Sequence, residues 1–391
     1  MKEKNELRTY VSLHILRRKA LAFALAFALV LSTIITMVPM LEVKAEETWE
    51  YPTSAPENPF DGGDGSAENP YKIATAQQLA NLAWLSNDWN GSKTYLDKYY
   101  ILTDNIDLGN KEWSKEISWS YDFKGVFDGG GHTVCGLYIN TTGNYAGLFA
   151  KTEGAVIKNL TVSGRVIGKD HAGGIVGKAD TDSVIRNCTN LCEVSGNYYV
   201  GGICGDGWDA SIYNCENIGN ITGVEIGGIC GENYSSDKDI YILDCSNYGD
   251  ITYDNGNYGG QAGGICGSFS GKSCSCSGCY NSGNVTCKYG TAGGIIGNFS
   301  GTIEKCYNTG TIKVLGYSSG AYVGGIVGEM HKNISNCYNR GGVIYEGTDN
   351  YAEIGGIAGG CYPSSNNVYS NCYNMGTAQG SSTSTRIGGI V

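Results

Sequence analysis

One motif recurs through most of this 391-residue chain. Gly-Gly-Ile-x-Gly, where x is any residue, occurs seven times from Gly173 to Gly355 and starts again at Gly388, with spacings of 28, 26, 36, 30, 31, 31 and 33 residues. A period of this size is typical of solenoids, in which each repeat forms one coil and buries its apolar face against its neighbours. The sequence therefore predicts a stack of similar coils rather than several globular domains.

A second motif follows each full copy of the first, namely a cysteine with an asparagine two residues later. The pairs are Cys188/Asn190, Cys215/Asn217, Cys245/Asn247, Cys279/Asn281, Cys306/Asn308, Cys337/Asn339 and Cys372/Asn374. Each repeat thus holds three short β-prone runs separated by turn residues, and none has the apolar period of a helix. Three strands per coil predict an all-β fold, a right-handed parallel β-helix (β-solenoid) of roughly nine or ten coils, with the hand taken from the crossover rule.

Stacked coils would place equivalent residues about 4.8 Å apart. The asparagines would then form a ladder in which each side-chain amide bonds the amides above and below, while the backbone takes the left-handed conformation of a tight corner. The paired glycines would occupy another corner, where a Cβ atom would obstruct the bend. Ile212 and Cys215 are three residues apart, so both can face inward only if the chain bends between them.

The chain divides into four segments. Residues 1–45 combine a basic stretch, an apolar run and a small-residue cleavage pattern, which predicts a secretory signal peptide, with an uncleaved anchor as the alternative. Residues 46–68, with prolines and an Asp/Gly cluster, are expected to form a flexible lead-in. Residues 69–145 would form an N-terminal cap and the first irregular coils, with a short capping helix after Thr75–Gln78. Residues 146–391 would form the repeat β-helix, truncated at the C-terminus because a new motif begins there.

Charge narrows the choice of partners. Without residues 1–45 the chain carries 20 basic and 35 acidic residues, a net charge of −15. Nucleic acid and anionic membrane surfaces are therefore not expected partners. No later segment is long and apolar enough to span a bilayer, so we expect no integral membrane domain after signal cleavage. The expected location is outside the cell, secreted or at the surface of a Gram-positive-like bacterium.

The two motifs together resemble GLUG repeats, which are named for a glycine, leucine or isoleucine, hydrophobic, glycine pattern. The resemblance covers roughly residues 69–391 and includes Asn69-Pro-Tyr-Lys-Ile, Gln78-Leu-Ala-Asn-Leu and Phe127-Asp-Gly-Gly-Gly-His132. It implies a secreted or cell-surface bacterial protein, and such repeats also occur in the non-catalytic region of immunoglobulin A specific zinc metallopeptidases. These repeats fix no activity.

Sixteen cysteines in an exported chain would ordinarily suggest disulfides. Here the repeat gives another interpretation, because Leu160 fills the slot that a cysteine fills in later coils. Most cysteines are therefore expected to be buried free thiols. The exception to consider is Cys274, Cys276, Cys279 and Cys287, which could ligate zinc or form a local disulfide. Since two of these four also fill repeat positions, we expect no metal and no cofactor.

Catalytic constellations are not evident. The zinc peptidase motif His-Glu-x-x-His is absent, and His171 and His331 are interpreted as exposed loop residues. Asp206 and Glu232 follow the repeat motif in consecutive coils, at a separation compatible with a retaining glycosidase, although a solvated turn is the preferred interpretation. The aspartates Asp104, Asp107 and Asp128 could bind calcium, but are expected to be structural loop residues.

A row of tyrosines is the candidate binding surface. Tyr280, Tyr307, Tyr338 and Tyr373 each follow the slot cysteine, so they should point outward and could contact glycans or host or cell-surface proteins. We predict a non-catalytic exported module for surface display, adhesion or ligand binding. The alternatives are a carbohydrate-active β-helix enzyme, either a polysaccharide lyase or a glycosidase, and the repeat region of a larger surface protease.

Overall fold

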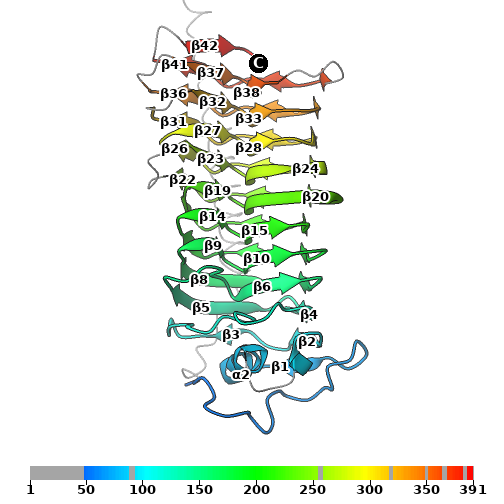
Figure 1. Cartoon of the computed structure of the whole chain (residues 1–391). Coiled ribbons are helices and arrows are strands. Elements are labelled where there is room, and N and C mark those ends of the chain that lie inside the picture. Colours follow the sequence, from blue (N-terminus) through cyan, green and yellow to red (C-terminus); the bar gives the residue numbers. More distant parts are fainter. Residues whose placement is uncertain are drawn as a thin grey trace, which may run out of the picture. The chain divides into compact units, whose positions relative to one another are not determined.

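The computed structural model describes residues 48–87, 93–253, 259–316, 320–347, 351–362, 368–381 and 385–390. They form a parallel β-solenoid of about ten turns (Figure 1). This confirms the fold class predicted from the repeat. The expected signal peptide, residues 1–45, lies outside the described residues.

The strands stack into three parallel sheets, which we call A, B and C. In the described residues sheet A contains β1 (Tyr71–Ile73), β2 (Tyr99–Leu102), β4 (Val126–Asp128), β6 (Phe149–Glu153), β7 (Val156–Lys158), β10 (Val176–Asp180), β11 (Val184–Arg186), β15 (Cys204–Trp208), β16 (Ser211–Tyr213), β20 (Cys230–Leu243), β24 (Cys266–Ser277), β28 (Ile296–Phe299), β29 (Thr302–Glu304), β33 (Val327–Met330), β34 (Ile334–Ser335), β38 (Ala358–Cys361) and β39 (Tyr369–Ser370).

Sheet B contains β3 (Ile106–Asp107), β5 (Thr133–Asn140), β8 (Thr161–Ile167), β12 (Thr189–Asn190), β13 (Glu193–Ser195), β17 (Glu216–Asn217), β18 (Ile221–Gly223), β21 (Ser246–Asn247), β22 (Ile251–Tyr253), β25 (Tyr280–Asn281), β26 (Val285–Cys287), β30 (Tyr307–Asn308), β31 (Ile312–Val314), β35 (Tyr338–Asn339), β36 (Val343–Tyr345), β40 (Tyr373–Asn374) and β41 (Ala378–Gly380). Sheet C contains β9 (Asp170–Gly173), β14 (Tyr198–Gly201), β19 (Glu225–Gly227), β23 (Gly260–Gly263), β27 (Gly290–Gly293), β32 (Ala321–Gly324), β37 (Ala352–Gly355) and β42 (Thr385–Gly388).

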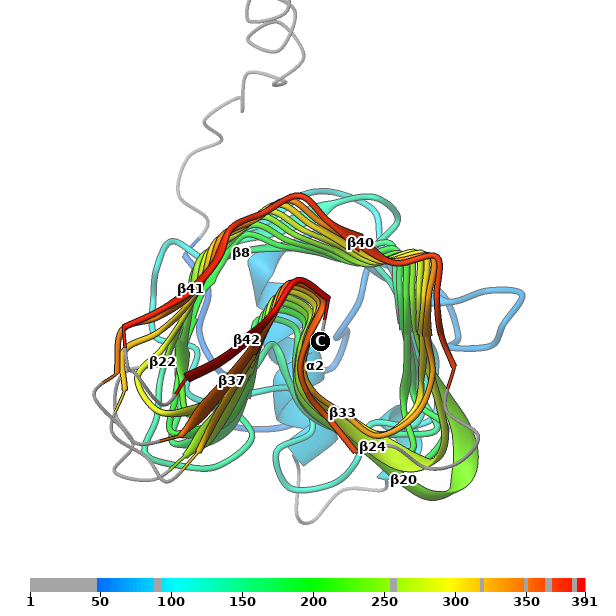
Figure 2. The same cartoon turned by 90° about the horizontal axis from the view of Figure 1, so that it is seen from above.

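Figure 2 shows the path of one coil. Sheet C runs inward, the Gly-Gly pair turns the chain sharply back, sheet A runs outward, and sheet B closes the far side. Seen from the C-terminal end, the chain winds counter-clockwise as it approaches the viewer, so the coil is right-handed (Figure 2). The solenoid therefore has the right-handed sense that the crossover rule predicted.

The corner between sheets A and B lies one residue before the slot cysteine. Asn187, Asn214 and Asn336 have φ values of 54°, 48° and 54° at this corner. This bend lets Ile212 and Cys215 both face the core, where neither is exposed. The left-handed conformation therefore belongs to the residue before the cysteine, and its assignment to the ladder asparagines was wrong, because those asparagines have ordinary strand geometry.

The predicted asparagine ladder is present in the interior. Each side-chain Nδ2 donates to the Oδ1 of the next coil over 2.7–2.8 Å, through Asn190, Asn217, Asn247, Asn281, Asn308, Asn339 and Asn374. The same nitrogen also donates to the backbone carbonyl two residues later, as from Asn217 to Gly219 at 2.8 Å. The buried amides are thus paired both along the solenoid axis and within their own coil.

The second glycine of each Gly-Gly pair packs directly against a side chain of the asparagine ladder. A Cβ atom on Gly202 would collide with the side chain of Asn217 and with the carbonyl of Gly228 in the next coil. Gly228 and Gly264 stand in the same relation to Asn247 and Asn281. Since these glycines do not have positive φ, the inward turn needs them for close approach rather than for an unusual backbone angle.

A helix packs at the N-terminal end of the stack. It is α2 (Ala76–Asn87), followed by a single 3₁₀ turn, η1 (Lys93–Tyr95), and it buries Leu79 and Leu82 under the first coils (Figure 1). Thr75 Oγ1 accepts a hydrogen bond from the backbone N–H of Gln78 at 3.3 Å, and the Gln78 side chain accepts one from Ala74 at 2.7 Å. Among the described residues no helix has both the length and the apolarity to cross a bilayer.

The segment expected to be a lead-in contacts this cap. Trp49 is 2% exposed, and its indole nitrogen donates to the Leu108 carbonyl at 3.0 Å. Its ring lies 5.2 Å from that of Trp113. These contacts attach the start of the described chain to the first coils.

Candidate functional site

A seam of outward-facing side chains runs where sheet C folds against sheet A. We define the seam by its sheet C residues (His171, Tyr199 and Glu225, with their equivalents), by Tyr145, whose ring lies beside His171, and by its sheet A residues (Lys151, Lys178, Asp206 and Glu232, with theirs). The last glycine of each motif lets the two sheets approach, because a Cβ atom on Gly205 would lie 2.6 Å from the backbone of His171. The repeat motif therefore brings side chains of consecutive coils together on the outer surface.

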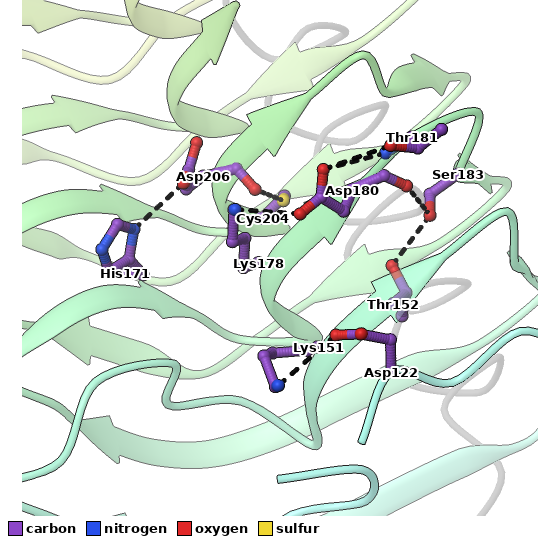
Figure 3. Close-up of polar contacts among 10 residues, drawn as sticks. All are labelled: Asp122, Lys151, Thr152, His171, Lys178, Asp180, Thr181, Ser183, Cys204 and Asp206. Carbon is purple, nitrogen blue, oxygen red and sulfur yellow. Dashed lines mark hydrogen bonds and ion pairs between the residues drawn. The ribbon is translucent and has the colours of Figure 1, made fainter. Parts of the chain in front are cut away.

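His171 and Asp206 form the best-defined pair in the seam. His171 Nδ1 lies 3.1 Å from Asp206 Oδ2, and the Asp206 residue is 6% exposed (Figure 3). The imidazole lies between the rings of Tyr145 and Tyr199, with both centroids 5.0 Å away. The expectation that His171 is an exposed loop residue was wrong, since it belongs to β9 and its side chain is 18% exposed.

Two further carboxyl groups, those of Glu225 and Glu232, lie next to this pair and form a cluster with Asp206. Asp206 and Glu232 are register partners on adjacent coils, and Glu225 faces them from sheet C. Burial, reinforced by the charges of Glu225 and Asp206, raises the pKa of Glu232 to about 7, although a hydrogen bond with the Tyr199 hydroxyl opposes this. Burial also raises the pKa of Glu225. Below about pH 7 the cluster therefore tends to retain a proton that isolated glutamates would release.

The basic residues of the seam are already paired. Lys178 Nζ lies 2.9 Å from Asp180, and Lys151 Nζ lies 3.4 Å from Asp122 (Figure 3). Asp206, Glu225 and Glu232 thus form an acidic patch next to satisfied lysines. Asp206 and Glu232 have different environments, and two such carboxyl groups could perform acid–base chemistry. However, the Asp206 carboxyl group already contacts His171, and the Glu232 carboxyl group already contacts Tyr199.

The predicted tyrosines lie in register on sheet B. Tyr280 pairs with Tyr307, Tyr307 with Tyr338, and Tyr338 with Tyr373. The Tyr280 and Tyr307 rings stack with centroids 4.3 Å apart, and those of Tyr338 and Tyr373 are 4.5 Å apart. Because the rings pack against each other within these two pairs, a ligand would meet mainly ring edges and hydroxyl groups where the paired rings cover one another.

The N-terminal aspartates serve the turns in which they lie. Asp128 lies 2.9 Å from Lys158 Nζ and accepts hydrogen bonds from the Gly130 N–H and the Asn159 amide, each at 2.9 Å. Asp107 accepts a hydrogen bond from the Gly109 N–H at 2.8 Å.

His331 was also expected to be an exposed loop residue. Its imidazole lies 3.3 Å from the Glu329 carboxyl group and stacks on the ring of Tyr362.

The cysteine cluster differs from the one suggested by the sequence. In the described part of the chain, the three thiols that approach one another within 4.8 Å are those of Cys276, Cys279 and Cys306. Cys306 comes from the next coil, which the local spacing of Cys274 to Cys287 could not reveal. The repeat alignment itself was the signal, because it places Cys306 directly beside Cys279.

Comparison with known proteins finds partial sequence relatives and a related fold. No family model matches the chain. A 120-residue stretch is 35% identical to the "Putative Gly-rich membrane protein" of Evansella cellulosilytica and covers 30% of this chain and 14% of that protein. A 158-residue stretch is 32% identical to "Halomucin" of Haloquadratum walsbyi and covers 37% of this chain and 2% of that protein. The chain therefore spans a small part of the length of these relatives.

A solved structure has a related fold. It is the crystal structure of a "putative immunoglobulin A1 protease" from Bacteroides ovatus, with a TM-score of 0.52 and 24% sequence identity over 66% of this chain and 80% of that chain. At this identity the likeness concerns the fold alone. The chain is a β-solenoid repeat protein, and its relatives bear names of membrane or surface proteins, which fits a surface repeat module.

Proposed function

We propose that this chain is a non-catalytic, exported repeat module, secreted or held at the cell surface, that displays or adheres to a ligand. The observation that supports this most is the tyrosine row on sheet B. Its Tyr307 and Tyr373 are 43% and 56% exposed, yet their rings are held by stacking on neighbouring coils. Pre-stacked aromatic side chains lose little conformational freedom on binding, so such a row suits a polar ligand such as a glycan or a cell-surface protein.

Binding to glycan arrays and to intact cells tests this proposal. A Tyr307→Ala/Tyr338→Ala double variant should lose at least tenfold in affinity, because both residues lie at the middle of the row. Tyr198→Ala is the matched control, since this tyrosine is 45% exposed but lies on sheet C. Equal binding by the double variant and the parent chain would exclude the tyrosine row as the contact surface.

A carbohydrate-cleaving enzyme is the second candidate, favoured by the Asp206/Glu232 pair. One carboxyl group contacts His171 while burial raises the pKa of the other to about 7, so an acid and a base could coexist near neutral pH. Screening on pectins, host glycans and mucins tests this candidate. Turnover that disappears in Asp206→Asn and Glu232→Gln variants would replace the non-catalytic proposal.

The repeat region of a larger surface protease is a third candidate. It is supported by the name given to the Bacteroides ovatus structure and by the low share of its relatives that this chain spans. Peptidase activity in a longer form of the protein, absent from residues 46–391 alone, would support it.

A further inference from the structure

An exposed apolar stripe runs along the outer face of sheet B. It contains the tyrosine row and extends it toward the N-terminal end through residues that directly follow the ladder asparagines. Its members are Leu191, Ile218, Tyr248, Tyr280, Tyr307, Tyr338, Tyr373 and Met375. Six of these residues are 40–67% exposed, and Tyr280 and Tyr338 are half-buried. A contiguous apolar surface of this kind is typical of a protein contact surface.

The stripe is continuous and flat. The Tyr248 ring meets the Tyr280 ring edge-on, with centroids 5.9 Å apart, and the Tyr338 hydroxyl donates to the Met375 sulfur at 3.6 Å. Figure 2 shows the sheet B strands of successive coils nearly superimposed along the solenoid axis. A flat face of this kind can pack against a copy of itself over its whole length.

The stripe is centred on the coil of Tyr280. Leu191 lies three coils before this coil, and Met375 lies three coils after it. Two exposed charges beside the stripe have the same centre, since Glu216 lies two coils before Tyr280 and Arg340 lies two coils after it. Opposite charges at equal distances from a centre are what a self-complementary two-fold interface requires.

We propose that the stripe binds the stripe of a second copy of this chain, in a two-fold symmetric dimer whose solenoids run antiparallel. The two-fold axis passes through the level of Tyr280, so Glu216 of each copy lies beside Arg340 of the other. A parallel dimer would instead place Glu216 against Glu216 and Arg340 against Arg340, which is unfavourable. The inference rests on the proposed function, because it names the partner of the tyrosine row.

The area of the stripe sets the strength of such a dimer. Seven coils at about 4.8 Å and a width of about 15 Å give about 500 Å² per copy, or about 1,000 Å² in total. This is the size of weak and transient protein–protein interfaces. We therefore expect a reversible dimer with a dissociation constant in the micromolar range, strengthened by avidity where many copies meet on facing cell surfaces.

Sedimentation equilibrium over a range of concentrations tests the proposal, on the chain from residue 46, which is the form expected after signal cleavage. The parent chain should pass from monomer to dimer as its concentration rises. Leu191→Ser/Ile218→Ser should weaken dimerisation at least tenfold, because it removes two apolar contacts per copy outside the tyrosine row. Serine should be tolerated there, since Ser282 lies at the equivalent position of a later coil.

Trp208→Ser is the matched control. It removes a side chain that is 42% exposed on sheet A, at a position where a later coil has Ser270, and should dimerise within twofold of the parent chain.

A charge exchange tests the antiparallel orientation. Glu216→Arg should weaken dimerisation at least threefold, because it brings two arginines together at both ends of the interface. Adding Arg340→Glu to this variant should restore the dimer to within twofold of the parent chain, since the opposite charges then meet again.

Three results would overturn the inference: a chain that stays monomeric at every concentration, an apolar variant that dimerises like the parent chain, or a charge exchange that does not restore the dimer. A monomeric chain that still binds glycans or cells through Tyr307 and Tyr338 would overturn this inference and leave the proposed function in place. A chain that dimerises as expected, but whose Tyr307→Ala/Tyr338→Ala variant binds glycans and cells like the parent chain, would contradict the proposed function and leave the dimer in place.

Discussion

A ladder asparagine satisfies several polar groups with one side chain. The amide of Asn247 donates to Asn281 at 2.8 Å and to the Gly249 carbonyl at 2.8 Å, and it accepts from Asn217 at 2.7 Å. Each net hydrogen bond contributes about 1 kcal/mol, but a buried polar group left without a partner costs about 1–3 kcal/mol. The ladder therefore contributes to stability mainly because its loss would leave buried amide groups without hydrogen-bond partners.

Replacing Asn247 by alanine should destabilise the fold by about 2–4 kcal/mol, because Asn217 loses an acceptor and Asn281 loses a donor, both in the interior. Urea or thermal unfolding followed by circular dichroism measures the effect. Asn197→Ala, at an exposed position, is the control and should change stability by less than about 0.5 kcal/mol. Equal effects at the two positions would show that the ladder does not stabilise the core.

At the scale of elements, the seam couples sheet C of one coil to sheet A of the next. Glu232 contributes a pH-dependent term, because its pKa is raised to about 7 in the folded chain, above the usual value of an unfolded glutamate. The folded state then binds this proton more tightly than the unfolded state. The contribution of Glu232 is consequently most favourable below pH 4 and is lost as the pH rises to about 7.

A Glu232→Gln variant should therefore gain stability relative to the parent chain as the pH rises from about 4.5 to 7.5, by on the order of 1–2 kcal/mol given the partial solvent exposure of the group. Thermal unfolding at several pH values measures this difference. Glu193→Gln, at an exposed position of sheet B, should show no such trend. A constant difference between the Glu232 variant and the parent chain would contradict the assigned pKa.

The sequence predicted the elements better than the contacts between them. The repeat predicted strands, stacking and the asparagine ladder, since these depend only on the period along the chain. The corner residues could also have been found, because Asn187, Asn214 and Asn336 precede slot cysteines and asparagine tolerates positive φ. The His171–Asp206 pair and the approach of Cys276 to Cys306 depend on how the coil bends in space, which the period does not specify.

At the scale of the whole molecule, one repeat corresponds to one complete coil of the solenoid. Ala262 and Ala292 are register partners at the same point of consecutive coils, each directly before a Gly-Gly pair. Deleting residues 263–292 would remove one 30-residue coil and create a junction identical to the existing one. Since each coil contacts mainly its neighbours, the shortened chain should keep its fold.

We expect this one-coil deletion to unfold cooperatively, with a melting temperature lowered by only a few degrees. Deleting half a coil, residues 263–277, should instead prevent folding, because it removes β24 and would place sheet B residues at sheet A positions. Circular dichroism and size-exclusion chromatography distinguish the two cases. A full-coil deletion that aggregates like the half-coil deletion would refute the modular stack.

The central claim is that the repeat defines one solenoid coil whose cysteines are core residues with free thiols. All sixteen are unpaired, and thirteen of them are buried; Cys135, Cys361 and Cys372 are half-buried. Titration with a thiol reagent tests this directly, on chelator-treated protein that has been purified without any reducing agent. We predict that at most these three react in the folded chain and that all sixteen react after unfolding. An unfolded chain with almost no reactive thiol, or a folded chain in which most thiols react, would contradict the account.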